Sequence, residues 1–230
     1  MNSTDPKPLS IGIILDGNRR WAKEHNLPTL EGHRKGAEKV RELMEWAHEL
    51  GLGTVYIYAF STENWNRSPE EVAYLMELFA EAFTGDLVSE VGKRNGRIVF
   101  IGDRSRLTAE LVQKMEETER ETSTGKGTTL AVCMSYGGRG EILHATNTLI
   151  RAGKEIQTEE EFARALWRDD LPDPDLLIRT SGEKRLSGFL TWQSVYSELF
   201  FIDTKWPAFT KEEFLSIIEE FGNRERRRGK

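Results

Sequence analysis

The sequence predicts an α/β fold: a single domain with an open, mostly parallel central sheet of about six strands flanked by helices. Six short runs are apolar and rich in β-branched residues, as is typical of strands that are buried on both faces of a parallel sheet. Segments with helical spacing alternate with these runs, which is the order that parallel strands require. The candidate strands are Ile11–Leu15, Thr54–Phe60, Arg97–Ile101, Thr129–Met134, Leu176–Arg179 and Leu199–Ile202.

The helices between these strands are marked by their periodicity and their caps. Apolar residues recur at helical spacing over residues 37–50, and Gly51 supplies a stop signal. Ser68-Pro69 is a strong helix start, because it combines a capping hydroxyl with a proline in the first turn. Apolar residues then continue over 72–83. Further helices are expected to begin at Ser105, Thr158 and Thr210.

The composition indicates a soluble enzyme-sized domain. The 230 residues fit one domain over 11–230, preceded by a polar leader over 1–10 that lacks the apolar stretch of a signal peptide. A net charge of −6 argues against general nucleic-acid binding. The single cysteine, Cys133, excludes a disulfide within the chain. Since no run reaches about 18 apolar residues, we expect a cytoplasmic protein with at most peripheral membrane contact.

The first polar cluster follows the first candidate strand and reads Asp-Gly-Asn-Arg-Arg-Trp over residues 16–21. Asp-Gly and Asn favour turns, so a plain turn explains its first half equally well. The chain continues, however, through two arginines to Glu31-Gly32-His33 at the start of a helix, where backbone amides form an anion cradle. Arginine matches phosphate oxygens, and Asp16 would repel that anion unless a hard cation such as Mg²⁺ lies between them. This pattern indicates a diphosphate site.

A second cluster, Phe-Ser-Thr-Glu-Asn-Trp-Asn-Arg over residues 60–67, follows the next strand. A solvated loop is the simple explanation. Because the segment is anchored at both ends, it also suits a lid over a phosphate, with Arg67 as donor and Trp65 as a shield.

The last cluster, residues 179–187, contains Arg179, Arg185 and Ser187. A surface ion-pair network is the alternative, but apolar residues follow directly and favour a partly buried site. Glu198 lies in apolar surroundings, where a carboxylate needs a partner or a metal.

Two glycine turns complete the pattern. Tyr-Gly-Gly-Arg over 136–139 permits close approach of backbone to a ligand, although a tight turn explains it equally well. The Gly102-Asp103 turn is expected to be structural. The chain has no G-x-G-x-x-G or Walker-type motif, which weakens a nucleotide-binding hypothesis.

Taken together, these segments resemble the cis-prenyltransferase family, whose type member is undecaprenyl diphosphate synthase. The resemblance covers residues 11–229, and it is specific because several independent signatures agree in order and spacing. The signatures are Asp-Gly-Asn-Arg-Arg-Trp-Ala (16–22), Glu-Gly-His (31–33), Phe-Ser-Thr-Glu-Asn-Trp (60–65), Tyr-Gly-Gly-Arg (136–139), Arg-Thr-Ser-Gly-Glu-x-Arg-Leu-Ser (179–187), Trp-Gln (192–193) and Glu-Leu-x-Phe (198–201).

The resemblance implies a homodimeric α/β enzyme with a hydrophobic product tunnel and Mg²⁺ as cofactor. The implied reaction is a sequential 1′–4 condensation of isopentenyl diphosphate with an allylic diphosphate, namely farnesyl or geranylgeranyl diphosphate. The product would be a medium- or long-chain Z-polyprenyl diphosphate, a lipid carrier precursor, with release of diphosphate.

The resemblance also implies residue roles. Asp16, Asn64 and Ser61 would be catalytic, and Asp16 with Glu198 would hold the metal. The ending Arg227-Arg228-Gly229 resembles the tail that in this family reaches the partner's site. The residues expected to bind substrate are Gly17, Asn18, Arg19, Arg20, Trp21, His33, Phe60, Trp65, Arg67, Glu71, Arg179, Arg185 and Ser187.

The chain departs from the family pattern at a few positions. Thr29 stands where an arginine is usual, Ser135 replaces an asparagine, and Gly188 and Thr191 replace an asparagine and a leucine. Activity is still expected, because none of these departures touches the implied catalytic residues. The small side chain of Ala59 favours medium- or long-chain products.

Two interpretations from other classes stay open. One is a silent partner subunit of a heteromeric enzyme, against which the retained catalytic residues argue. The other is a phosphate-binding α/β enzyme of unrelated chemistry, which no nucleotide motif supports.

Overall fold

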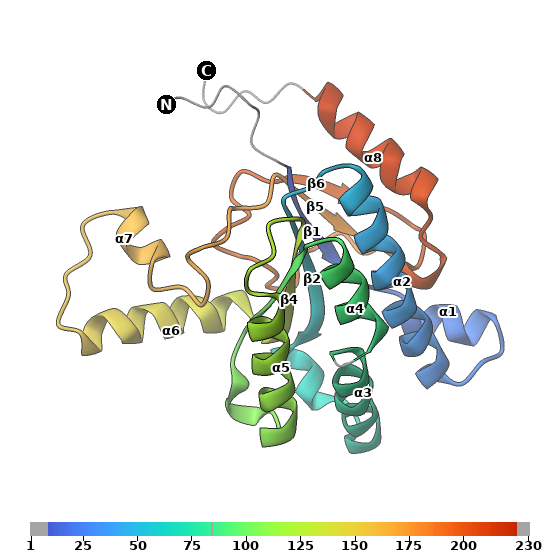
Figure 1. Cartoon of the computed structure of the whole chain (residues 1–230), viewed down its shortest axis with the longest axis horizontal. Helices are drawn as coiled ribbons and strands as arrows, with labels where there is room; N and C mark the ends of the chain where they lie inside the picture. Colours follow the sequence, from blue (N-terminus) through green and yellow to red (C-terminus); the bar gives the residue numbers. More distant parts are fainter. Residues whose placement is uncertain (1–8, 84, 225–230) are drawn as a thin grey trace.

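Six parallel strands make the centre of the molecule, and their spatial order is β3-β4-β2-β1-β5-β6 (Figure 1). This computed structural model describes residues 9–83 and 85–224. The predicted fold class is confirmed, and every strand pairing in the described residues is parallel. The strands are β1 (Ser10–Ile14), β2 (Thr54–Ser61), β3 (Arg97–Ile101), β4 (Thr129–Tyr136), β5 (Leu176–Arg179) and β6 (Glu198–Phe201).

The strand boundaries differ from the prediction mainly at the carboxyl ends. β2 and β4 each run past the predicted apolar segment, to Ser61 and Tyr136. The polar residues at these ends therefore continue the strands towards one edge of the sheet. At the amino end, Ser10 already belongs to β1 rather than to the leader. The predicted tail over 227–229 lies outside the described residues.

A serine or threonine hydroxyl caps the start of α3, α5, α7 and α8. The predicted caps Ser68, Thr158 and Thr210 are confirmed, because each side-chain oxygen accepts a backbone N–H from its helix. The predicted start at Ser105 is wrong: this residue lies in a short 3₁₀ turn, and Thr108 caps the helix instead. The helices are α1 (Asn18–Glu24), α2 (Thr29–Glu49), α3 (Pro69–Ala82), α4 (Asp86–Lys93), α5 (Ala109–Thr122), α6 (Gly138–Arg151), α7 (Glu159–Ala163) and α8 (Lys211–Asn223), with 3₁₀ turns η1 (Thr62–Asn66), η2 (Arg104–Arg106) and η3 (Trp206–Ala208).

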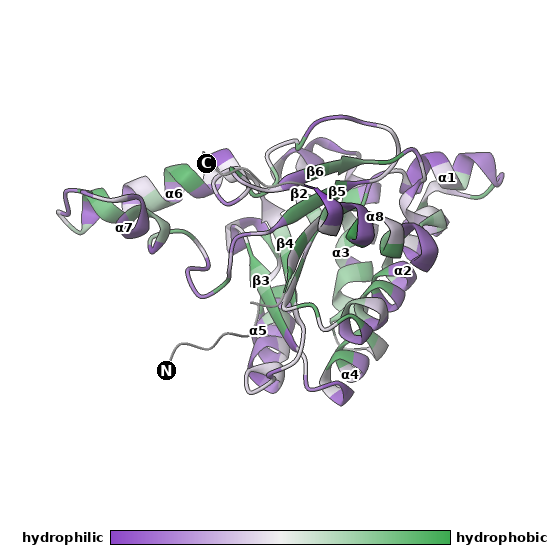
Figure 2. Cartoon of the chain, turned by 90° about the horizontal axis from the view of Figure 1, so that it is seen from above, coloured by the Kyte–Doolittle hydropathy of each residue, from purple (hydrophilic) through white to green (hydrophobic). Residues whose placement is uncertain are grey.

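Both faces of the sheet are covered. Residues of α2, α3, α4, α5 and α8 share one apolar core with one face of the sheet, as the side chains of Leu43, Leu75 and Phe214 illustrate. The other face packs against the segment that follows β5, where Phe189 stacks on Tyr58 with 4.9 Å between ring centroids. In two perpendicular views, α6 and α7 extend away from the sheet as an arm (Figures 1 and 2).

α1 lies tightly against α2, and glycine makes this contact close. A Cβ atom at Gly32 would lie only 2.1 Å from the backbone oxygen of Asn18. Gly17, which precedes α1, has φ of 105°, a conformation that glycine adopts at little cost. These two glycines fix the turn that carries Asp16. No helix in the part of the chain described here is long and apolar enough to cross a membrane.

Candidate active site

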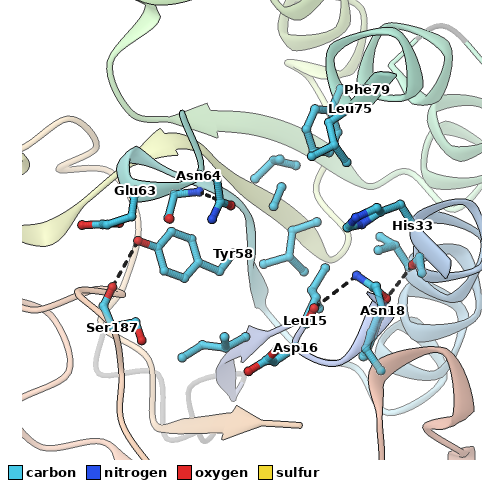
Figure 3. A pocket seen from close by; sticks show the side chains of 18 of the residues that line it. Leu15, Asp16, Asn18, His33, Tyr58, Glu63, Asn64, Leu75, Phe79 and Ser187 are labelled. Carbon is cyan, nitrogen blue, oxygen red and sulfur yellow. Dashed lines mark hydrogen bonds between the residues drawn. The ribbon is translucent and has the colours of Figure 1, made fainter. Parts of the chain in front are cut away.

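A cavity of about 640 Å³ opens beyond the carboxyl ends of β1, β2, β4 and β5 (Figure 3). Ligands bind at this edge in open parallel sheets. Its mouth is polar, while its interior lies between the sheet and α3. The polar residues at the mouth include Asp16, Asn18, His33, Ser61, Asn64, Arg67, Arg179 and Ser187, and the apolar interior includes Val40, Ile57, Leu75, Leu78, Phe79, Phe83 and Leu87.

Arg179 and Asp16 form the central ion pair of the mouth. β1 and β5 are neighbours, and their register pairs Ile14 with Arg179. The Arg179 Nη2 atom therefore lies 2.9 Å from Asp16 Oδ2, although the strands are 163 residues apart in sequence. Arg179 Nη1 donates to Ser187 Oγ at 2.9 Å. The other Asp16 oxygen faces Arg20 at 3.3 Å, so the carboxylate lies between two guanidinium groups.

The Arg179 guanidinium is shielded from solvent. Its side chain is only 6% exposed. Its Nε atom is buried and has no hydrogen-bond partner. A buried donor without a partner is costly, so this position of the guanidinium has to be stabilised by its other contacts.

A second network lies on the opposite side of the mouth and joins three helical elements. Glu71 of α3 lies 3.2 Å from His33 Nε2 on α2, and its carboxylate also pairs with Arg67 at 3.0 Å. Arg19 of α1 is 3.9 Å from the same carboxylate. Burial, followed by the nearby Arg67 charge, lowers the pKa of His33 below its ordinary value. His33 is therefore neutral at pH 7.

The η1 turn brings Asn64 to the cavity. The Asn64 Oδ1 atom accepts the backbone N–H of Ser61 at 3.1 Å, which leaves the Nδ2 amine to donate towards the cavity. The segment over 60–67 was expected to be a loop, and the structure instead forms a 3₁₀ turn here. Tyr58 stands between η1 and Ser187 in Figure 3, with its hydroxyl 3.3 Å from the Ser187 carbonyl.

A second hollow, of about 620 Å³, adjoins the mouth and shares Asp16, His33 and Arg67 with the main cavity. Arg19, Arg20 and Lys23 of α1 and the turn at Gly17 also line it, and the hollow reaches Thr29. Several cations therefore surround a space large enough for a diphosphate group. Residues 16–20, which were predicted to cradle an anion, all line this hollow, and their role in binding stays a prediction.

Not every predicted residue faces the cavity. Trp21 stacks on His25 with 4.2 Å between centroids. Phe60 is part of the buried core, and Trp65 packs on it with 4.9 Å between centroids. Arg185 is 61% exposed and pairs with Glu183. None of these four side chains lines the two hollows, and their role in substrate binding stays a prediction.

Glu198 also lies apart from Asp16 within one chain. It pairs with Leu176 at the amino end of β5, whereas Asp16 meets Arg179 at the carboxyl end. At about 3.3 Å per residue, this register separates the two carboxylates by roughly 15 Å or more. Arg224 is the partner of Glu198, at 2.9 Å. The chain by itself does not bring Glu198 to Asp16, and its metal role stays a prediction.

Comparison with known proteins decides the family. The family described as "Putative undecaprenyl diphosphate synthase" matches residues 14–229. The chain belongs to this prenyltransferase family. It is 44% identical over 226 residues to an isoprenyl transferase of Thermotoga maritima, covering 96% of this chain and 97% of the relative. It is 46% identical over 231 residues to the tritrans,polycis-undecaprenyl-diphosphate synthase (geranylgeranyl-diphosphate specific) of Pyrococcus horikoshii, covering 97% and 87%.

Solved structures of prenyltransferases share the fold. Lavandulyl diphosphate synthase from Lavandula x intermedia, in complex with dimethylallyl diphosphate, superimposes with a TM-score of 0.92 at 31% identity, covering 97% of this chain and 98% of that one. A probable undecaprenyl diphosphate synthase from Campylobacter jejuni gives a TM-score of 0.82 at 34% identity, covering 98% and 100%. The family and the fold inferred from the sequence motifs are confirmed.

Some polar residues of this prenyltransferase cavity were not predicted from the sequence, among them Tyr58 and Arg139. Tyr58 and Arg139 both line it, from β2 and from the start of α6. Tyr58 looked like one of several apolar residues of a buried strand. Arg139 was noted only as the end of a glycine turn, and the position of the turn at the edge of the sheet was the available signal.

The lowered pKa of His33 predicts a pH dependence of stability. An unfolded histidine takes up a proton below pH 6.5, whereas the folded imidazole resists it. The free energy of unfolding should therefore fall as the pH drops from 6.5 towards the lowered pKa, and it should be unaffected by this group above 6.5. Urea unfolding across this range should show a smaller slope for His33→Gln than for the wild type. The control His25→Gln replaces an exposed histidine that follows α1 and leaves His33 in place, so it should keep the dependence that His33 causes. Equal slopes in all three proteins would contradict the assignment to His33.

Proposed function

We propose that this prenyltransferase condenses isopentenyl diphosphate 1′–4 with farnesyl or geranylgeranyl diphosphate, in successive steps, to give a medium- or long-chain Z-polyprenyl diphosphate. The observation that carries the proposal is the division of one cavity into a cationic mouth and an apolar interior. Such a cavity suits a molecule with a diphosphate head and a hydrocarbon tail. The geranylgeranyl diphosphate named for the Pyrococcus horikoshii relative has this form.

The two polar lobes of the mouth suit the two diphosphates. The hollow around α1, with Arg19, Arg20 and Arg67, would take the allylic diphosphate, whose tail then extends into the interior. Arg179 and Ser187, on the β5 side, would take isopentenyl diphosphate. This assignment places the olefin of isopentenyl diphosphate near Asn64 and Ser61, the residues expected to act there.

The bond changes explain why these groups are needed. The allylic C1–O bond breaks and its electron pair leaves with diphosphate, C4 of isopentenyl diphosphate bonds to C1, and a proton leaves the isopentenyl unit. Guanidinium groups stabilise the charge that develops on the leaving diphosphate. The apolar interior keeps water from the cation-like carbon. The neutral imidazole of His33 adds no positive charge beside that carbon.

Mg²⁺ fits the mouth as a cofactor held by Asp16. No group of three or more potential metal-binding side chains is found over residues 9–83 and 85–224. Mg²⁺ is often bound through one or two carboxylates together with substrate phosphates, so one carboxylate among phosphate donors suffices. Asp16 is partly exposed, lines both hollows and contacts Arg179 and Arg20, which would turn to the phosphates. The ion, when bound, neutralises diphosphate charge.

Leu87 is proposed as the floor that limits product length. The cavity ends among Ala82, Phe83 and Leu87, and Leu87 also lines a small separate hollow beside Met44 and Val91. This side chain therefore stands between the two spaces. Ala59 lines the cavity nearer the mouth, where its small side chain leaves the path open.

The test of the function is incubation of the pure protein with Mg²⁺, labelled isopentenyl diphosphate and farnesyl or geranylgeranyl diphosphate. We expect a ladder of Z-prenyl diphosphates, resolved by chain length, because the apolar interior accepts the growing tail. A folded protein that incorporates no label with either starter would contradict the proposal and leave the silent partner subunit as the better interpretation.

The same analysis of product lengths tests the role of Leu87. Leu87→Ala should shift the longest product upwards by one or more isoprene units, since removal of the side chain opens the way to the second hollow. Leu215→Ala, which shortens an exposed leucine of α8, is the matched control and should leave the product distribution unchanged. A wild-type distribution for Leu87→Ala would show that another residue sets the length.

A homodimer is proposed as the working form. Large apolar side chains are exposed on α6 and beyond β5, among them Leu143 and Ile150 at 61% and 67% and Val195 and Tyr196 at 71% and 72%. Gln193 donates to Glu141 of α6 at 3.1 Å, which joins these segments into one surface. Exposed apolar surface of this kind marks an interface, and a second copy would cover it.

Sedimentation equilibrium tests the dimer. The wild type should have twice the mass of the chain, and Val195→Asp with Tyr196→Asp should shift it towards the monomer, because charges would be placed in an apolar contact. A monomeric wild type at micromolar concentration would contradict the proposal.

A further inference from the structure

The η1 turn leaves the sheet at an irregular place. β2 pairs with β4 in regular register from Thr54 to Tyr58, but the register shifts between Tyr58 and Phe60 and again between Phe60 and Ser61. The regular ladder of hydrogen bonds therefore ends before the segment that carries Asn64. A 3₁₀ turn of five residues has little stability of its own. A capping box between Ser61 and Asn64 fastens the start of the turn. Contacts from other elements add to this support.

The Trp65 side chain supplies the anchor. Its Nε1–H donates to Ser135 Oγ at 3.0 Å. Its ring meets Phe60 edge to face, with 4.9 Å between centroids and 77° between planes. The guanidinium carbon of Arg106 lies 4.5 Å from the ring centroid, a cation–π contact. The Trp65 side chain thus contacts Ser135, Phe60 and Arg106. Its neighbour Asn64 lines the cavity.

Ser135 and Arg106 belong to one rigid support. The Ser135 carbonyl accepts the backbone N–H of Asp103 at 3.2 Å, which fastens the turn after β3 to the end of β4. Asp103 Oδ1 in turn accepts the N–H of Ser105 at 2.9 Å and so caps η2, the turn that carries Arg106. At Gly102 a Cβ atom would lie 2.0 Å from the Met134 carbonyl oxygen, so the turn after β3 is in close contact with the end of β4.

We propose that Arg106 and Ser135 are positioning residues for the condensation: they clamp Trp65 and thereby hold Asn64 at the cavity. Neither side chain lines the cavity, so both act through Trp65. The proposal rests on the proposed function, and it gives the Gly102-Asp103 turn a role that its sequence did not reveal. Ser135 occupies one of the positions where the chain departs from the family pattern, which makes this clamp a property of this sequence.

The contacts set the size of the effect. A cation–π contact at a partly exposed site corresponds to about a two- to fivefold change in an equilibrium. One hydrogen bond of ordinary strength corresponds to about a two- to twelvefold change. Since only the clamped form of η1 would be productive, Arg106→Leu and Ser135→Ala should each lower kcat by at most these factors, the full factor applying when the unclamped form becomes the major one. The double variant should lower kcat further, by at most about the product of the two factors.

The kinetic experiment separates positioning from binding. Labelled isopentenyl diphosphate and farnesyl diphosphate are used with the full chain. We expect kcat to fall while the KM for farnesyl diphosphate stays within about twofold, because the residues of its site are untouched. Arg106→Lys should recover much of the lost rate, since it restores a cation over the ring. Arg120→Leu, which removes the same charge from the exposed surface of α5, is the matched control and should behave as the wild type.

A second readout does not depend on turnover. The indole N–H of Trp65, assigned in NMR spectra by its loss in Trp65→Phe, should be protected from hydrogen exchange in the wild type. Arg106→Leu and Ser135→Ala should each speed this exchange, while Arg120→Leu should not. This measurement tests the clamp even if the wild type catalyses no condensation. The absence of condensation would count against the proposed function alone.

The proposal would be overturned by a double variant that keeps both the wild-type kcat and a protected Trp65 indole. Faster exchange with unchanged kcat would also overturn it, because the clamp would then exist without positioning Asn64. A lowered kcat with an unaltered indole would do the same, because the loss would then arise elsewhere.

Discussion

The pair of buried Arg179 and partly exposed Asp16 is the interaction on which the rest of the site depends. Two adjacent parallel strands, far apart in sequence, end at the same level and bring a guanidinium against a carboxylate at 2.9 Å. Burial of the guanidinium is tolerable because Asp16, Ser187 and the Arg185 carbonyl accept hydrogen bonds from it. Removal of Asp16 would leave that charge uncompensated within the site.

The remaining architecture separates charge from hydrocarbon around this pair. α1, fixed by glycine packing on α2, places arginines at one side of the mouth. α3 stands across the apolar interior, and its Glu71 ties the mouth to His33 and Arg67. The same cavity is lined by His33, whose imidazole burial keeps neutral, and by Arg179, whose buried guanidinium is paired with Asp16. A diphosphate head and a prenyl tail need this combination, which explains how a single cavity can serve both parts of one substrate.

The fold was predictable because its signals are local. Apolar runs, hydroxyl caps and glycine stops specify strands and helices within a few residues, so β3, β5 and the cap at Ser68 were found where predicted. Convergence of the clusters at one edge followed from parallel topology alone. The direction of each side chain did not, because it depends on tertiary contacts. Trp65 was taken as a shield over the site, yet Ser135 of β4 and Arg106 of η2 contact it on the side where it packs against Phe60. Glu198 was grouped with Asp16 by motif, and only the strand register shows that one chain separates them.

The central claim, that Asp16 couples Mg²⁺ to diphosphate binding beside Arg179, is tested most directly by calorimetry with inorganic diphosphate. Titrations of the wild type and of Asp16→Asn, each with and without Mg²⁺, compare the effect of the ion in the two proteins. Mg²⁺ should tighten binding to the wild type markedly, because the carboxylate otherwise repels the anion. It should have little effect on Asp16→Asn, which should bind diphosphate better than the wild type when the ion is absent. An undiminished Mg²⁺ effect in Asp16→Asn would contradict the account.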